Sequence, residues 1–145
     1  GMAVGNAEMV QGLFKIKSNL DSGIPQAIQE MAIEALLRSQ EYIDNNNSVY
    51  QIRRDKLIGA LTNIGLKVTS PQAALYLWVR VPEGYSSESF TATLLDDLAI
   101  AVTPGSSFGE CGEGYIRLSL TTPDNMIDKG VERLLSWEIP PETGG

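Results

Sequence analysis

Arg117 is the residue of this chain whose type and position point most clearly to chemistry. It is the only arginine or lysine between Arg80 and Lys129. In residues 115–120, strand alternation places the apolar side chains on one sheet face and Arg117 on the opposite face. A guanidinium that projects from a polar sheet face can hold a carboxylate through two hydrogen bonds. We therefore expect Arg117 to point away from the helices and to bind a carboxylate; on these residues alone, the alternative is an ordinary surface arginine.

Glycines are concentrated just before Arg117, in residues 105–114. Glycine lets backbone amides approach a phosphate, which suggests a nucleotide-binding loop. Such a loop connects a strand to a helix, however, and here a strand follows. No Walker lysine is present. The pattern therefore favours a mobile connection between two strands over a phosphate site.

Other reactive groups are scarce. The chain has no histidine, which excludes Ser-His-Asp and Cys-His nucleophiles and every imidazole-based zinc site. The single cysteine, Cys111, cannot form an internal disulfide, and its neighbours Glu110 and Glu113 oppose a nucleophilic thiolate. Asp96 and Asp97 are adjacent on a predicted helix and point about 100° apart, so we expect both to be solvated. No metal site is expected.

The composition is typical of one folded domain. The chain has 145 residues, 43% of them hydrophobic and 20% charged, so it can form a core without disulfides or metals. The net charge is −7, and only three of the 11 basic residues follow Pro82. This excess of acidic residues argues against binding to nucleic acid or to an anionic membrane. Because neither a membrane span nor a signal peptide is recognisable, we expect a cytoplasmic protein.

Helices dominate the first half of the sequence. Asn6 can cap a helix that ends near Ser18, and Ser22 with Pro25 can start a long helix over residues 25–45. The run 45–47 consists of three asparagines and predicts a break, after which Ser48 caps a third helix that ends at Gly65.

Strands alternate with helices in the second half. Strands are predicted at 66–68, 75–81, 99–103 and 115–121, and helices from Ser86 or Ser87 to Leu98 and from Pro123 to Leu135. Tyr76 and Trp78 share one face of their strand, and we expect core packing on both faces. The result is an α+β fold, in which a small, mostly antiparallel sheet has helices on one face and follows a helical arm. We expect an arm at 1–47, a small domain at 48–139 and a flexible tail at 140–145.

The sequence also resembles the class I/II aminotransferases of fold type I, which use pyridoxal phosphate. The resemblance rests on their C-terminal motif, matched here by residues 102–109, Gly112 and residues 114–119. Residues 71–82 resemble the family's strand with tyrosine and tryptophan. Residues 1–6 resemble the strand and turn after its phosphate-binding arginine, and residues 15–23 with Gln26 resemble the segment that leads into its long interdomain helix. The likeness covers nearly the whole chain.

The resemblance implies a role for Arg117, which matches the arginine that binds the substrate α-carboxylate. Phe108 and Gly109 match the loop beside that site. The Schiff-base lysine, the phosphate-binding arginine and the large domain correspond to sequence before residue 1, and none of the five lysines here lies in the lysine motif. We therefore expect no catalytic residue, no bound pyridoxal phosphate and no activity in this chain alone.

Two functions remain open at this stage. The chain can be the C-terminal segment of an amino-acid aminotransferase, acting on an amino acid and a 2-oxo acid. Alternatively, it is a stand-alone, non-enzymatic module that binds a carboxylate ligand or a protein partner. The opening Gly1-Met2 is compatible with a cut point in a longer enzyme or with a naturally short chain. Residues 19–23 resemble diaminopimelate-, alanine- and aspartate-type relatives, which leaves the substrate open.

We also expect a homo-oligomer. In the parent fold the opening helices contact the large domain, so their apolar residues would lack partners here and favour association through the arm. The alternative is an arm that folds back over the sheet face bearing Tyr115 and Arg117.

Overall fold

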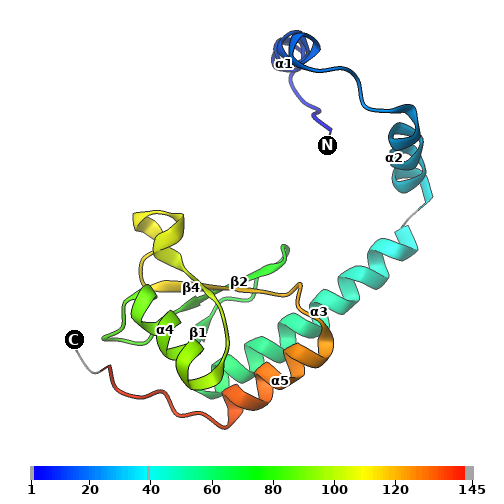
Figure 1. Cartoon of the computed structure of the whole chain (residues 1–145). Coiled ribbons are helices and arrows are strands. Elements are labelled where there is room, and N and C mark those ends of the chain that lie inside the picture. The colour runs from blue at the N-terminus through cyan, green and yellow to red at the C-terminus, as the bar shows by residue number, and fades with distance from the viewer. Residues whose placement is uncertain (1, 39, 143–145) are drawn as a thin grey trace. The chain divides into compact units, whose positions relative to one another are not determined.

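The computed structural model describes residues 2–38 and 40–142 of the chain. The chain divides into two compact units between Ile43 and Asp44, drawn in Figure 1. Only the second unit contains a buried hydrophobic core, because all 14 buried apolar side chains among the described residues lie between Leu57 and Leu134.

Two helices make up most of the first unit. Helix α1 spans Ala7–Leu20 and begins where the Asn6 side chain accepts a hydrogen bond from the Met9 backbone N–H at 3.1 Å, which confirms the predicted cap. Helix α2 spans Gln26–Arg38. No described residue of these two helices is buried.

Helix α3 spans Gln40–Asn63 and corrects two expectations. The long helix predicted over 25–45 is helical in its described part, at 26–38 and 40–45, but the break predicted at 45–47 is wrong, because α3 continues through the asparagine run. Ser48 is not a cap; its hydroxyl donates to the Asp44 carbonyl one turn earlier, at 2.8 Å. Asparagine lowers helix stability by only about 0.5 kcal/mol per residue, which the buried apolar residues of the last turns outweigh. Gly65 ends the helix in the left-handed conformation (φ +88°), as predicted.

The second unit contains a four-stranded antiparallel sheet. Its strands are β1 (Lys67–Val68), β2 (Tyr76–Arg80), β3 (Thr103–Pro104) and β4 (Tyr115–Ser119), in the order β1-β2-β4-β3. Each neighbouring pair is antiparallel, which confirms the predicted sheet. The strand predicted over 99–103 is mostly wrong: Ala99 instead ends the preceding helix with φ +50°, and only Thr103 belongs to a strand.

Helices pack against the inward face of the sheet. Helix α4 spans Ser87–Leu98, with Ser86 as its cap, and helix α5 spans Asp124–Leu135. Together with the end of α3, they contribute apolar side chains that pack in one cluster with alternate residues of β2 and β4. The fully or nearly fully buried members include Leu61, Phe90, Leu134, Leu77, Val79, Ile116 and Leu118. This arrangement is the predicted α+β fold.

The segment after α5 contacts α4 and the residues before it. The Trp137 indole N–H donates to the Asp97 carboxylate at 3.0 Å; Asp96 and Asp97 are both exposed, as expected. The Tyr85 hydroxyl donates to the Pro140 carbonyl at 2.8 Å, and the Ser89 hydroxyl donates to Glu142 at 2.7 Å. The predicted tail at 140–145 therefore makes contacts in its described part, while 143–145 lie outside the described residues.

Two features are absent from the described residues. None of their helices is both long enough and apolar enough to span a bilayer. Nor do three or more histidine, cysteine, aspartate or glutamate side chains gather there in a way that could hold a metal ion.

Candidate functional site

The outward face of the sheet carries the candidate site. Strand alternation buries Leu77 and Val79 of β2 and leaves Tyr76 and Trp78 exposed, at 38% and 40% of their surface. Core packing on both faces of this strand was expected and is wrong for the part of the chain that is described. The two aromatic residues instead form a surface beside Arg117.

Arg117 lies at the centre of this face. It is half-buried between the buried Ile116 and Leu118, and its Cα partners are Trp78 of β2 and Thr103 of β3. Its side chain contacts rings of the outward face, which confirms the predicted orientation away from the helices.

Two aromatic rings contact the guanidinium of Arg117. The carbon at its centre lies 4.1 Å from the centroid of the Tyr76 ring and 4.5 Å from that of the Phe108 ring. Cation–π contacts of this kind contribute about 0.5–1 kcal/mol each at partly exposed sites. The rings carry no negative charge. No carboxylate in residues 2–38 or 40–142 forms an ion pair with Arg117. The N–H groups of the guanidinium are therefore available to an anion.

Further aromatic contacts hold the Phe108 ring in place. The Trp78 ring meets Phe108 edge to face, with 5.4 Å between centroids, and meets Tyr115 in the same manner at 6.3 Å. Edge-to-face pairs at such distances are favourable. Trp78 therefore supports the ring that contacts Arg117, while Tyr115 supports Trp78.

The glycine-rich segment positions Phe108. This connection between two strands forms two short 3-10 helices, η1 (Gly105–Phe108) and η2 (Glu110–Gly112). The backbones of Gly105 and Gly112 pack directly on each other, and a Cβ atom at Gly105 would lie only 2.6 Å from the Tyr115 carbonyl oxygen. This close approach explains why glycine is needed there, and it fixes the loop that carries Phe108.

Glu113 ties the same loop to the start of α4. Its carboxylate accepts hydrogen bonds from the Ser87 hydroxyl at 2.7 Å and from the Ser87 backbone N–H at 2.8 Å. The Ser87 hydroxyl, the Ser87 N–H and the Gly114 N–H, in that order, hold the pKa of Glu113 below its ordinary value because all three stabilise the charged form. Cys111, also in this loop, is exposed.

The lysines of the second unit do not provide a site for pyridoxal phosphate beside Arg117. Lys56 pairs with Asp128 at 2.6 Å, Lys67 lies on the edge strand β1, and Lys129 lies on α5. The residues that surround Arg117 thus fit a carboxylate group and do not fit this cofactor. Chemically, the site can bind and orient an anion.

Sequence reasoning identified Arg117 and the loop at Phe108 but missed the contribution of Tyr76. The signal was present in part, because alternation already placed Tyr76 and Trp78 on one face. What the pattern lacked was the register, which sets Trp78 opposite Arg117 and Tyr76 opposite Ser119.

Comparison with known protein families gives one clear match. The family described as aminotransferase class I and II matches residues 1–134. An LL-diaminopimelate aminotransferase of Dehalococcoides mccartyi is 59% identical over 138 residues, covering 95% of this chain and 36% of that protein. The protein of the same name from Aquifex aeolicus is 45% identical over 139 residues, covering 96% and 36%. The chain thus spans about a third of the length of these curated relatives.

Solved structures agree with the sequence comparison. An aminotransferase from Staphylococcus aureus superposes with a TM-score of 0.83 at 34% identity, covering 91% of this chain and 35% of that one. A probable N-succinyldiaminopimelate aminotransferase from Thermus thermophilus superposes with a TM-score of 0.81 at 29% identity, covering 91% and 35%.

Proposed function

This chain belongs to the class I and II aminotransferase family, and we propose that it is the C-terminal segment of an amino-acid aminotransferase. In this proposal Arg117 binds the α-carboxylate of the substrate. The observation that carries it is the position of Arg117, centred on the exposed sheet face between two aromatic rings and without an ion pair to any described carboxylate.

The proposed substrates are LL-diaminopimelate and a 2-oxo acid. The relatives from Dehalococcoides mccartyi and Aquifex aeolicus carry the name LL-diaminopimelate aminotransferase, which supports this choice. An amino acid and a 2-oxo acid share the α-carboxylate and differ at the neighbouring carbon. One arginine can therefore hold both partners of the transfer in the same orientation.

Arg117 contributes binding and orientation in this proposal. Its planar guanidinium donates two parallel hydrogen bonds to a carboxylate, which fixes the plane of that group as well as its position. The rings of Tyr76 and Phe108 pack against the half-buried guanidinium and reduce its contact with water. Each bond to the carboxylate is stronger where water is excluded, and the reacting carbon is then held at a fixed place relative to the sheet.

Amino-group transfer in this family uses pyridoxal phosphate, which supplies the electron sink for the reaction. Because no lysine of the second unit lies beside Arg117, we propose that the 145-residue chain alone has no transaminase activity. An assay with LL-diaminopimelate, 2-oxoglutarate and added pyridoxal phosphate tests this: glutamate production above the uncatalysed rate would contradict it.

A second candidate function is a non-enzymatic module that binds a carboxylate ligand or a protein. The observation that favours it is the complete core of the second unit, which contains 14 buried apolar side chains. Such a core can hold the Arg117 face in place without the rest of an aminotransferase. Such a module uses the same contact between Arg117 and a carboxylate but does not transfer an amino group.

A binding experiment on the chain tests the carboxylate role that both functions share. We would follow the Arg117 side-chain Nε resonance by NMR during titration with L-alanine, and with ethylamine as a matched amine without a carboxylate. We expect a saturable shift with L-alanine only. Arg117→Gln should abolish the response at the neighbouring Thr103 and Trp78 amides. An equal response to ethylamine, or an unchanged response in Arg117→Gln, would contradict the role.

A further inference from the structure

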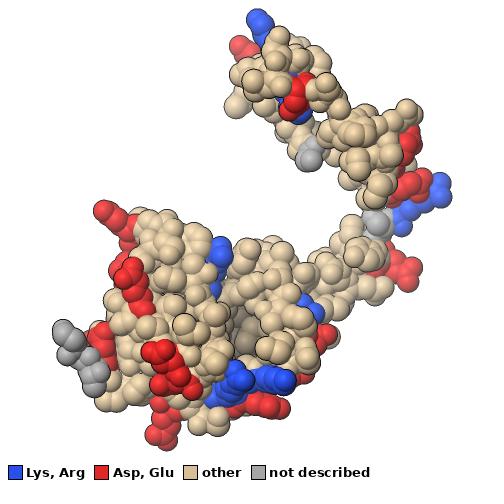
Figure 2. All heavy atoms as spheres, in the orientation of Figure 1, with Lys and Arg blue, Asp and Glu red and all other residues tan. Residues whose placement is uncertain are grey.

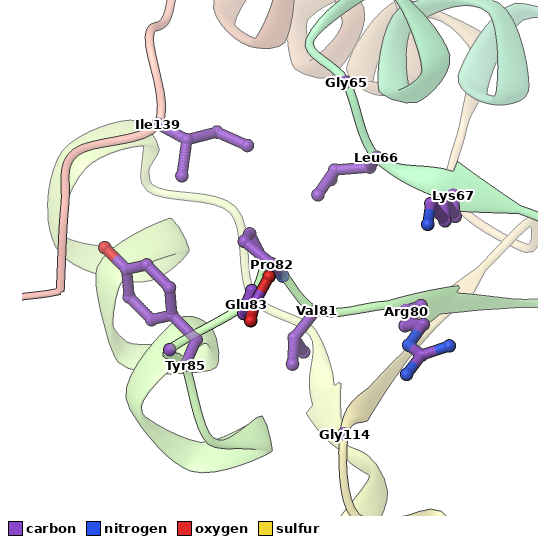
Figure 3. Close-up of a pocket in the computed structure, with 11 residues that line it drawn as sticks. Gly65, Leu66, Lys67, Arg80, Val81, Pro82, Glu83, Tyr85, Gly114 and Ile139 are labelled. Carbon is purple, nitrogen blue, oxygen red and sulfur yellow. The ribbon is translucent and has the colours of Figure 1, made fainter.

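A cavity of about 650 Å³ lies at the β1 end of the sheet, outside the Arg117 site (Figure 3). This volume is in the range of small-molecule sites. Its apolar wall includes Leu66, which is buried, and Val81, Tyr85 and Ile139, which pack against the core. Arg117 does not line it.

Two cations line the same cavity. Lys67 of β1 and Arg80 of β2 are direct Cα partners across the antiparallel pair, and Figure 3 shows them on neighbouring strands at one side of the cavity, across from Tyr85 and Ile139. Like charges directly opposite each other destabilise a strand pair. Neither cation forms an ion pair with a carboxylate in the described part of the chain.

Three other cations of the second unit, all on α3, have carboxylate partners. Arg53 pairs with Asp124 at 2.6 Å, Arg54 with Asp55 at 2.8 Å, and Lys56 with Asp128 at 2.6 Å. The chain has 18 acidic residues against 11 basic ones, so carboxylates are plentiful. Lys67 and Arg80 differ from the other cations without an ion pair in the described residues because they are direct partners across a strand pair, which sets two positive charges opposite each other.

Protection of a sheet edge explains only part of this arrangement. Lysine on an edge strand discourages pairing with another chain, and β1 is the edge strand that carries Lys67. Strand β2, which carries Arg80, lies between β1 and β4 and is not an edge. Edge protection therefore does not explain why Arg80 stands opposite Lys67.

We infer that this cavity binds a small organic anion, namely an apolar body that carries one carboxylate or phosphate group held between Lys67 and Arg80. Such an oxyanion relieves the repulsion of the two cations, and the apolar body covers Val81 and Ile139, which are half-buried. Glu83 also lines the cavity and repels a second, separated negative charge, which limits the ligand to one anionic group. This inference does not depend on the proposed function of Arg117.

The test is a titration of the 145-residue chain followed by two-dimensional amide NMR. The probes are phenylacetate, phenyl phosphate and the neutral phenylacetamide. We expect saturable shifts at Gly65, Gly84 and Gly114, which line the cavity, with the two anions and not with phenylacetamide. The ratio of the two anion affinities identifies the preferred head group. Arg117→Gln should leave these shifts unchanged, which separates this site from the carboxylate site.

Charge variants decide the role of the two cations. The double variant Lys67→Gln/Arg80→Gln should weaken binding of the anions at least tenfold, because both charge-assisted contacts are lost. Lys67→Arg/Arg80→Lys, which keeps both charges, should stay within about threefold of the parent chain. Lys15→Gln/Arg38→Gln removes the same charge from the first unit and should change nothing. The absence of saturable shifts at the three glycines, an equal response to phenylacetamide, or an unchanged affinity in Lys67→Gln/Arg80→Gln would overturn the inference.

Discussion

At the scale of single residues, the account rests on the contacts of Arg117. Arginine on a solvent-exposed strand normally samples many rotamers, and ordering its side chain costs about 2 kcal/mol of entropy. Here the Tyr76 and Phe108 rings lie 4.1 and 4.5 Å from the guanidinium, so part of the side-chain entropy is already lost before a ligand binds. Carboxylate binding by Arg117 should therefore depend on both rings.

Removing either ring tests this dependence. We predict that Tyr76→Leu and Phe108→Leu each weaken carboxylate binding at Arg117 by about two- to fivefold, the equivalent of one cation–π contact. Titration with L-alanine, followed at the Arg117 Nε, gives the affinities. Tyr115→Leu is the matched control, because that ring contacts Trp78 and is not in contact with the guanidinium. Equal losses in all three variants would show that the rings act only through general stability.

Glu113 gives a prediction for pH. Its pKa is lowered in the folded chain from the ordinary value of 4.5, so its contribution to stability is complete above pH 4.5 and is lost as the pH falls through the lowered pKa. Urea unfolding of the parent chain and of Glu113→Gln should therefore differ at pH 7 and converge in acid. Glu110→Gln, in the same exposed loop, is the control and should show no such convergence. A difference that stays constant down to pH 3 would refute the assignment.

At the scale of elements, the glycine-rich segment links the sheet to the site. Local sequence alone indicated a mobile connection, because glycine is permissive and favours no single conformation. The ordered form depends on the direct packing of Gly105 on Gly112 and on the hydrogen bonds of Glu113 with Ser87. These contacts join residues that are distant along the chain, and local patterns cannot reveal them.

Gly105→Ala tests the loop. The new Cβ would lie 2.6 Å from the Tyr115 carbonyl oxygen, so the backbone has to move, and overpacking of this kind destabilises by about 1–3 kcal/mol. Displacement of Phe108 should also weaken carboxylate binding. Gly59→Ala is the control: it lies in α3, where a Cβ meets nothing within 4 Å, and should raise stability by about 0.5–1 kcal/mol. Chemical denaturation measures both, and a neutral Gly105→Ala would contradict the packing.

The same distinction between local and distant effects explains how far the sequence predicts the fold. Strand alternation placed Arg117 and the buried Ile116 on the correct faces because side chains in a strand alternate strictly. The break predicted at residues 45–47 failed because the propensity of asparagine is a weak local effect, whereas the burial of Leu57 and Leu61 stabilises α3 through tertiary packing. Tyr76 was missed as a partner of Arg117 because the two are joined only through the pairing of β2 with β4.

At the scale of the whole molecule, the chain contains one unit with a core and one without. In Figure 2 the surface of the second unit carries many acidic side chains, in line with the net charge of −7. The first unit exposes large apolar side chains on both α1 and α2, including Met9, Leu13, Phe14, Ile28, Met31 and Leu36. An apolar surface of this extent is typical of an interface.

We propose that these side chains are covered by a second copy of the chain when the rest of the parent enzyme is absent. Each reburied aliphatic side chain contributes about 1.5–3 kcal/mol, so four or five of them offset much of the entropy lost on association. Light scattering over a dilution series should show a dimer or larger assembly, and Leu13→Ser/Phe14→Ser should dissociate it. A monomer at micromolar concentration whose α1 resists protease would contradict association.

The central claim is that Arg117 binds the substrate carboxylate in an aminotransferase, and a chimera tests it most directly. In the chimera, this chain replaces the matched segment of the Dehalococcoides mccartyi relative, of which it covers 36%. We predict that the chimera converts LL-diaminopimelate. Arg117→Gln should lower kcat/KM by about 100-fold or more through loss of a paired, charge-assisted contact, while Lys129→Gln, on the exposed side of α5, leaves it unchanged. If the Arg117→Gln chimera stays within threefold of its parent in kcat/KM, the claim is wrong.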